Sequence, residues 1–311
     1  MINFRYHVVS LTAVFLALAI GLIVGTAALN GPLSEELSHN VSQLSRQNGQ
    51  YRDQVNQLES EVAQREQFAT EVAPALLAGK LAGRRVLVLS MQQSASYVDD
   101  MVADLQLAGA KVTGQVEIED SFFKPTNREA LLELASTSLA SIGNSTITGL
   151  PANSDGVETS AALLAAVLLD HVPEVAADTM KTVLQAYQQY LSIKADVTGP
   201  AEAVVVLANP PYSDQAAADE NKNMFTMITQ FDNAGAIVVG APGNAGQGNV
   251  ISAITGDATV SKSTSTVDDV DTPQGRIAAT LALYEQLVFG RAGHYGIASS
   301  ASSLLPKLSP P

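Results

Sequence analysis

A long uncharged segment near the N-terminus limits the fold more than any other feature of the sequence. From Val8 to Leu29 the chain reads VVSLTAVFLALAIGLIVGTAAL, without one charged side chain. A helix of about 20 apolar residues crosses the roughly 30 Å hydrocarbon core of a bilayer. Signal peptides have shorter apolar cores of about 7–15 residues. Although Gly25-Thr26-Ala27 would suit a cleavage site, the length of the run favours an uncleaved transmembrane helix over residues 8–29.

The flanking charges predict the orientation of this helix. Arg5 precedes it, and the first charged residues after it are Glu35 and Glu36. Positively charged flanks stay on the cytoplasmic side of a membrane. We therefore predict a cytoplasmic N-terminus over residues 1–7 and a C-terminal part outside the cytoplasm.

Small residues inside the segment favour self-association. Ala17, Gly21 and Gly25 are four residues apart, the small-xxx-small spacing that lets two membrane helices approach closely. The same spacing is common by chance in a segment rich in alanine and glycine. It therefore gives only slight support to a dimer through Gly21 and Gly25.

Residues 33–77 predict a coiled-coil stalk of roughly 60 Å, at 1.5 Å per residue. Apolar residues recur at alternating steps of four and three until Pro74 and Gly79 end the pattern. β-Branched residues at position a with leucine at d favour a parallel dimer, and a single asparagine at a fixes the register. The alternative is an amphipathic helix packed on its own domain, which normally has a wider apolar face. Position a holds Val41, Asn48, Val55 and Val62, position d holds Leu37, Leu44, Tyr51 and Leu58, and the spacing continues through Arg65, Ala69, Val72 and Leu76.

The remainder, residues 84–298, has the pattern of an α/β domain. The run RRVLVLS is typical of a strand buried on both faces. A helix with one apolar face follows, Gly109 is placed to cap it, and strand character returns over residues 110–116. This is one β-α-β unit. The apolar face of its helix consists of Val98, Met101, Val102 and Leu105.

A second β-α-β unit is expected farther along the chain. It consists of AEAVVVLANPPYS, a long helix around residues 224–231 and AGAIVVGAP, and its corner NAGAIVVG resembles LAGAKVTG of the first unit. We therefore predict a Rossmann-like domain with a mostly parallel sheet. Other helices are expected near 127–139, 159–171 and 178–193, and from Thr272-Pro273, as N-cap and first residue, to Gly290; residues 299–311 are expected to form a flexible tail.

Charge and composition exclude several kinds of partner and site. Lys and Arg total 17 against 31 Asp and Glu, a formal net charge of −14. Such a chain repels the phosphate backbone of nucleic acids. The chain has no cysteine, so it is neither a disulfide scaffold nor a thiolate metal protein.

Three aspartates are the weak candidates for a metal site. Carboxylates such as those of Asp268, Asp269 and Asp271 are the ligands that hard cations prefer. They also stand just before a predicted helix, where negative charge complements the helix dipole, and this second interpretation is favoured. Among the histidines, His294 in the motif GHYG is the one that a fold would best position. His7, His39 and His171 form no pair with metal-ligand spacing.

Motifs for catalysis or phosphate binding are weak. Gly240–Gly248 follows a predicted strand, where backbone N–H groups can approach a phosphate. It matches neither a P-loop nor GxGxxG, so a simple turn is favoured, and the chain has no GxSxG elbow. We expect a non-enzymatic protein with no catalytic residues and no evident cofactor.

Copper prefers cysteine, methionine and histidine ligands. Met224 and Met227 lie on one predicted helical face, but the neighbouring Phe225, Ile228 and Phe231 make core packing the favoured interpretation. The other methionines available for such a site are Met91, Met101 and Met180.

Several motifs together resemble the MctB family of actinobacterial envelope proteins. They are INFRYHVVSLTAVFLALAIGLIVG, the stalk, RRVLVLS, STVDDVDTPQGRIAATLAL and GRAGHYG, and they cover nearly the whole chain. The resemblance implies copper transport or homeostasis, with an outer-membrane location. A related branch, SteB, implies a role in cell separation and peptidoglycan cleavage with a partner called SteA.

The residues favour a different location from the one that the family label implies. A transmembrane barrel needs segments of about ten residues that alternate between lipid-facing and lumen-facing side chains, whereas this sequence has one spanning helix and continuous apolar strands. We predict a dimeric, single-pass protein of the cell membrane that acts in copper homeostasis, with an envelope scaffold of SteB type as the alternative. Copper as a ligand is implied by the resemblance alone.

Overall fold

The computed structural model describes residues 4–30, 32–142, 147, 150–151, 155–213, 215–243 and 249–308. The chain forms two compact units, Met1–Arg65 and Glu66–Pro311. The first unit contains helix α1 (Phe4–Asn30) and most of helix α2 (Pro32–Leu77). The segment Arg5–Ala27 of α1 has a mean hydropathy of 2.6, and among the described residues it is the one helix that is long and apolar enough to cross a membrane. The expected apolar N-terminal helix is therefore present.

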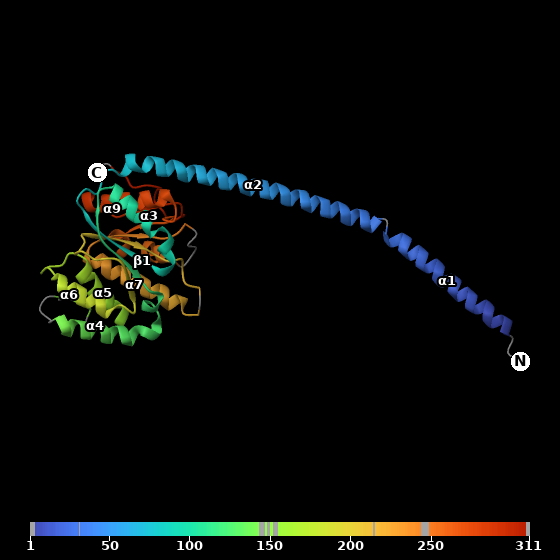
Figure 1. The fold of residues 1–311 in the computed structure, drawn as a ribbon, viewed down its shortest axis with the longest axis horizontal. Helices are drawn as coiled ribbons and strands as arrows, with labels where there is room; N and C mark the ends of the chain where they lie inside the picture. The colour runs from blue at the N-terminus through green and yellow to red at the C-terminus, as the bar shows by residue number, and fades with distance from the viewer. Residues whose placement is uncertain are drawn as a thin grey trace. The chain divides into compact units, whose positions relative to one another are not determined.

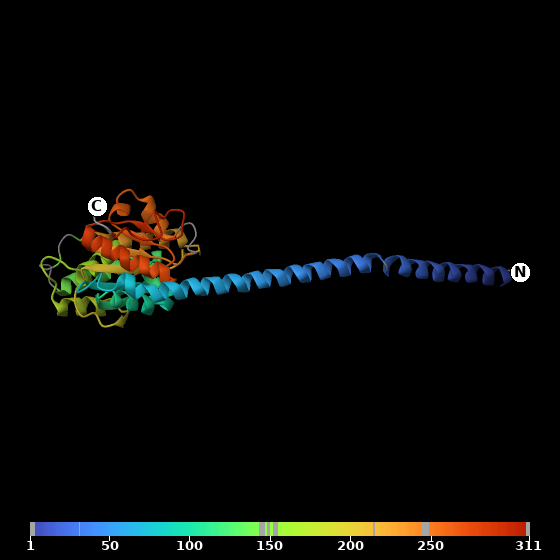
Figure 2. The same cartoon turned by 90° about the horizontal axis from the view of Figure 1, so that it is seen from above.

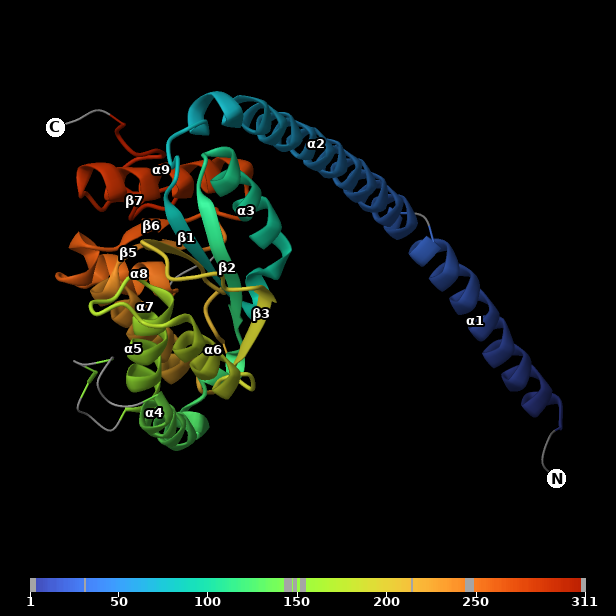
Figure 3. The same cartoon turned by 60° about the vertical axis from the view of Figure 1, so that its left-hand side comes forward.

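The strands of the described residues form one sheet of seven strands in the order β3-β2-β1-β4-β5-β6-β7 (Figure 3). Neighbouring strands are parallel, except that β3 runs antiparallel to β2. This confirms the mostly parallel sheet. The strands are β1 Arg85–Met91, β2 Lys111–Ile118, β3 Leu191–Ala195, β4 Ala203–Leu207, β5 Ala236–Gly240, β6 Ser265–Val267 and β7 His294–Tyr295.

Helices cover both faces of this sheet (Figure 1). Alternate residues of each central strand point to opposite faces, so the strands contribute to two hydrophobic clusters. One cluster joins the sheet to α4 (Arg128–Ile142), α5 (Gly156–Leu168), α6 (Ala177–Ala186), α7 (Ala217–Ala234) and α8 (Val250–Gly256). The other joins it to α3 (Val98–Leu107), α9 (Pro273–Phe289) and the C-terminal end of α2, the side that Figure 2 shows from above.

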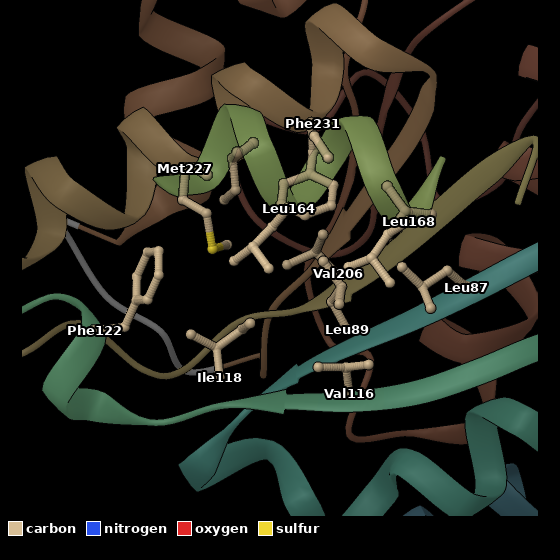
Figure 4. Packing of buried hydrophobic residues seen from close by; sticks show 14 of the residues in the cluster. Leu87, Leu89, Val116, Ile118, Phe122, Leu164, Leu168, Val206, Met227 and Phe231 are labelled. Carbon is tan, nitrogen blue, oxygen red and sulfur yellow. The ribbon is translucent and has the colours of Figure 1, made fainter. Parts of the chain in front are cut away.

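The larger cluster has its centre between the sheet and the pair α5 and α7. Leu164 and Leu168 of α5 and Phe231 of α7 point toward Leu89 of β1 and Val206 of β4 (Figure 4). All five side chains are at most 1% exposed. Burying a side chain of this size contributes about 1.5–3 kcal/mol, so this contact is a principal source of the stability of the domain.

The helix expected over residues 178–193 is wrong in its second half. Helix α6 ends at Ala186, and Leu191–Ala195 forms the edge strand β3. Tyr187 and Tyr190 are buried between them. Pairing with β2 supplies backbone hydrogen bonds to this segment, and such tertiary pairing overrides local helix preference.

Other elements follow the sequence more closely. The N-cap of α9 is Thr272, whose side chain accepts a hydrogen bond from the N–H of Gly275, and Gly290 ends the helix with a left-handed backbone. The two expected β-α-β corners are present, but they differ in conformation: Gly109 has φ +88°, whereas Gly235 is extended with φ −176°. Strands β6 and β7, of 3 and 2 residues, are too short to show a strand pattern in the sequence.

The segment after β7 differs from the expected flexible tail as far as it is described. Ser302 N–H donates to the carbonyl of His294 at 2.8 Å, and Gly296 N–H donates to the carbonyl of Ser303 at 3.1 Å. Arg291 Nη2 donates to the carbonyl of Lys307 at 3.1 Å. The part of the tail up to Leu308 is therefore bonded to the domain.

Replacing Gly156 with alanine should destabilise the domain. A Cβ at this position would overlap the carbonyl oxygen of Arg128 and lie 2.7 Å from the amide nitrogen of Leu132, so α4 and α5 would have to separate. We expect a loss of about 1–3 kcal/mol, as for other overpacked sites, measured by urea unfolding. Gly256→Ala is the matched control, since its Cβ would meet nothing within 4 Å. Equal unfolding midpoints for the two variants would contradict the close helix contact.

Candidate functional site

The carboxyl ends of the parallel strands lie along one edge of the sheet. Ligands of doubly wound α/β proteins bind at this edge, at the point where the strand order reverses. Here that point lies between β1 and β4, because the chain continues from β1 to β2 on one side and from β4 to β5 on the other. A ligand site of this domain is therefore expected at this edge of the sheet.

Side chains of the protein itself bridge the ends of β1 and β4. The hydroxyl of Ser94 lies 2.7 Å from the carbonyl oxygen of Met91 and 2.9 Å from that of Leu207. Asn209 accepts a hydrogen bond from the N–H of Gln93 at 2.9 Å. Ser94 and Asn209 are almost fully buried. The polar groups at the reversal point are thus used to hold the two central strands together.

A partly buried polar network extends this bridge to the segment after β2. Tyr212 donates its phenolic hydrogen to Asp120 Oδ1 at 2.7 Å, and the amide of Asn209 donates to the same oxygen at 3.0 Å. Burial and the hydrogen bond to Asp120 raise the pKa of the Tyr212 phenol above its ordinary value. Asp120, Asn209 and Tyr212 belong to no motif recognised in the sequence. Their position directly after predicted strands is the signal that would have identified them.

The three aspartates after β6 form one acidic turn, but two of their carboxylates bond to different backbone groups. Asp268 accepts hydrogen bonds from the N–H groups of Ile297 at 2.5 Å and Ala298 at 3.0 Å. Asp271 accepts one from the N–H of Gly243 at 2.9 Å. These bonds hold the loops after β5 and β7 against the start of α9.

Asp269 is the chemically unusual member of the acidic turn. Its backbone has φ +65°, and its carboxyl atom Oδ1 is buried with no hydrogen-bond partner in the described part of the chain. Burial, together with the negative charges of Asp268 and Asp271, raises its pKa to about 7. The turn therefore contains a carboxyl group that exchanges its proton near neutral pH.

Glycines make this backbone possible. A Cβ at Gly243 would lie 3.1 Å from the Cβ of Asp269, and a Cβ at Gly275 would overlap the carbonyl oxygen of Asp269. Gly243 belongs to the predicted glycine-rich segment, whose residues 244–248 lie outside the described residues. For the part that is described, close packing accounts for the glycine.

His294 lies on the strand next to the acidic turn. Its Nδ1 is 2.8 Å from the hydroxyl oxygen of Thr266, and burial lowers its pKa. Within the described ranges, no group of three or more His, Asp or Glu side chains is arranged to hold a metal ion. Direct metal binding by Asp268, Asp269, Asp271 and His294 stays a prediction.

The methionine sulfurs that a soft copper site would need lie inside the two hydrophobic clusters. Met224 and Met227 are at most 1% exposed, which confirms their interpretation as core residues. Met91, Met101 and Met180 are buried as well. His7 and His39 are exposed, and His171 Nδ1 lies 3.1 Å from the carbonyl oxygen of Pro173.

A hollow of about 220 Å³ lies within the domain beside the end of α2. Ala73 and Pro74 of α2, Asp104 of α3 and Arg276 of α9 are among the residues that line it. Arg276 forms ion pairs with Asp100 at 3.2 Å and Asp104 at 3.5 Å. These ion pairs tie α9 to α3 at the point where both meet α2.

The predicted dimerisation residues are uncovered in the single chain. A Cβ at Gly21 or Gly25 would meet no atom within 4 Å, and Asn48 is exposed. The apolar heptad residues are each 49–66% exposed: Leu37, Val41, Leu44, Tyr51, Val55, Leu58 and Val62.

Known proteins are similar to this chain over nearly its whole length. A family model described as "Copper transport outer membrane protein, MctB" matches residues 1–306. A Mycobacterium tuberculosis protein named "Copper transporter MctB" is 28% identical over 320 residues, which are 98% of this chain and 99% of the relative. A Mycobacterium leprae protein of the same name is 29% identical over 325 residues, with the same coverage.

Asp269→Asn should change the pH dependence of stability. The unfolded carboxyl titrates near 3.9 and the folded one at about 7, so the folded state holds the proton more tightly. The free energy of unfolding should therefore fall as pH rises from about 4 to 7, by at most about 4 kcal/mol. Asparagine keeps the shape, tolerates positive φ and has no charge to bury.

At pH 7.5 we expect the asparagine variant to have a higher melting temperature than the unchanged protein. At pH 5 we expect this difference to be smaller. Asp99→Asn, at an exposed site in the first turn of α3, is the control and should leave the pH profile unchanged. A gain that is the same at both pH values would rule out the titration of Asp269.

Proposed function

The chain belongs to the MctB family, and on this premise we propose that it is a membrane-anchored, non-enzymatic protein of the cell envelope that acts in copper homeostasis. The supporting observation is the extent of the match. Relatives named as copper transporters align with 98% of the chain, so the alignment includes the apolar helix, the long helix and the domain together.

We propose that α1 spans the cell membrane once, with residues 1–7 in the cytoplasm and the domain outside. The uncharged length of the helix supports the span, and Arg5 on its N-terminal side supports the orientation. This location differs from the outer membrane of the family description. A continuous apolar helix of this hydropathy is suited to a membrane whose proteins span it as helices.

A single helix encloses no pathway for an ion, so we propose that the protein acts through its external domain. Copper(II) accepts oxygen and imidazole ligands, and the net charge of −14 attracts cations. For direct contact the residues to test are Asp268, Asp269, Asp271 and His294. Because Asp268 and Asp271 already bond to backbone groups, we propose weak binding or transfer to a partner rather than tight storage.

We also propose that the protein is a parallel homodimer through α2, with support from Gly21 and Gly25 in α1. An exposed apolar stripe on a long helix is costly in water, and heptad spacing suits a second copy of the same helix.

We propose as the alternative function a dimeric scaffold of SteB type that regulates peptidoglycan cleavage with a SteA-like partner. No relative reported above has this name, so the hypothesis depends on the resemblance in sequence and on the length of α2. Copper sensitivity and cell morphology separate the two functions.

Deletion of the gene should lower copper tolerance and raise cellular copper. The full chain should restore tolerance, and a chain without residues 1–30 should not, because the domain would lose its anchor. Zinc tolerance is the control and should not change. Unchanged copper tolerance together with chained cells would contradict the copper role and support the scaffold.

Reporter fusions should confirm the topology. Alkaline phosphatase fused after residue 308 should be active, since this enzyme needs an oxidising compartment outside the cytoplasm. A cytoplasmic reporter at the same site should be inactive. The protein should also stay with the inner-membrane fraction after alkaline extraction; release into the soluble fraction would indicate cleavage after Ala27.

A further inference from the structure

Helix α2 has two apolar surfaces in succession, and they differ in what covers them. From Leu37 to Val62 the apolar residues are at least 49% exposed. From Ala69 onward, Ala69, Ala73 and Leu77 are buried in the cluster that includes α3 and α9, and Leu76 packs against it. The heptad pattern of the sequence passes through both parts without distinguishing them.

The second surface has the spacing of a helix that packs on a domain. Ala69, Ala73 and Leu77, at steps of four, are 5%, 5% and 0% exposed. Val72, which the heptad pattern places at position d, is only partly buried. The buried stripe thus follows Ala69 and steps of four, rather than the alternating steps of a coiled-coil seam.

Charges mark the change between the two surfaces. Arg65 occupies position d, where two parallel helices would bring like charges into one layer. Arg65 instead pairs with Glu61 of its own helix at 3.7 Å. In a parallel dimer, position g of one helix faces position e of the next heptad on the other. This would place Glu61 opposite Glu66 of a second copy, and like charges repel.

On the N-terminal side of Arg65, the residues at heptad positions e and g are compatible with a second copy of α2. The facing g and e pairs are Asn40 with Ser45, Gln47 with Arg52, and Gln54 with Glu59. None of these pairs combines like charges. The polar Asn48 at position a favours a partner that presents its own Asn48 at the same level. Membrane anchoring raises the effective concentration of the second copy. This favours pairing of two short helices, because a coiled coil of fewer than about four heptads is only marginally stable without such help.

We propose that a second copy of this chain packs in parallel and in register on residues 37–62 of α2, and that the contact between copies ends at Arg65. From Glu66 the helix packs against its own domain instead. The proposal depends on the homodimer proposed above and adds its extent, so that Val72 and Leu76 are excluded from the interface although the heptad spacing includes them.

Cysteine cross-linking in membranes tests this directly, because the chain has no cysteine of its own. Single variants of the full chain carry Leu37→Cys, Leu44→Cys or Leu58→Cys inside the proposed interface. Arg46→Cys and Ser60→Cys lie on the opposite side of the same helix and are matched controls. Val72→Cys tests the excluded part. Membranes are oxidised with diamide, and covalent dimers are measured on non-reducing gels.

We expect strong dimer bands for the variants at residues 37, 44 and 58, and weak bands for those at residues 46, 60 and 72. Cross-links at both 37 and 58 require a parallel arrangement, because antiparallel helices would place these positions at opposite ends. Labelling with a maleimide shows whether the thiol at residue 72 is accessible: a thiol that reacts with the maleimide but forms no dimer supports the boundary.

Two results would overturn parts of the proposal separately. A strong band at residue 72 would show that the contact continues past Arg65, while the homodimer would stand. Absence of bands at residues 37, 44 and 58, or bands of equal strength at 46 and 60, would refute the homodimer itself. Copper tolerance of the deletion strain is measured independently, so failure here leaves the copper role unaffected.

Discussion

The burial of a parallel sheet on both faces is the constraint on which the domain depends. Parallel strands cannot be joined by hairpins, so each pair needs a crossover connection, and the crossovers place helices on both faces. The chain therefore has two hydrophobic clusters, one on each side of β1 and β4. The C-terminal end of α2 enters one of them beside α3 and α9, so the part of α2 from Glu66 onward belongs to the fold of the domain.

The same topology gathers the polar residues at one edge. Asp120 accepts hydrogen bonds that link the segment after β2 to the segment after β4. Asp268 and Asp271 accept hydrogen bonds that link the turn after β6 to the segments after β7 and β5. This arrangement stabilises the edge, yet it leaves the carboxyl group of Asp269 buried and able to exchange a proton near neutral pH. A carboxyl group buried in this state costs stability.

The chain combines an apolar N-terminal helix, a long helix with an exposed apolar stripe and a folded domain. This combination suggests that the protein acts at a particular location in the cell. Helix α1 is long and apolar enough to anchor the domain in a membrane, and the exposed stripe is the surface on which we propose that a second copy packs. The methionines within the described residues are buried, so the copper role proposed above would rely on oxygen and imidazole ligands rather than on a closed soft-ligand site.

The sequence by itself determined the apolar anchor, the heptads, the parallel β-α-β units and the start of α9 at Thr272, because local composition and periodicity decide these. It also identified Met224 and Met227 as core residues from their apolar neighbours. Only the tertiary structure decided that Leu191–Ala195 is a strand, that Asp120 meets Tyr212, and that α2 turns its apolar side to its own domain after Arg65. These depend on contacts between residues far apart in the chain, which local periodicity does not encode.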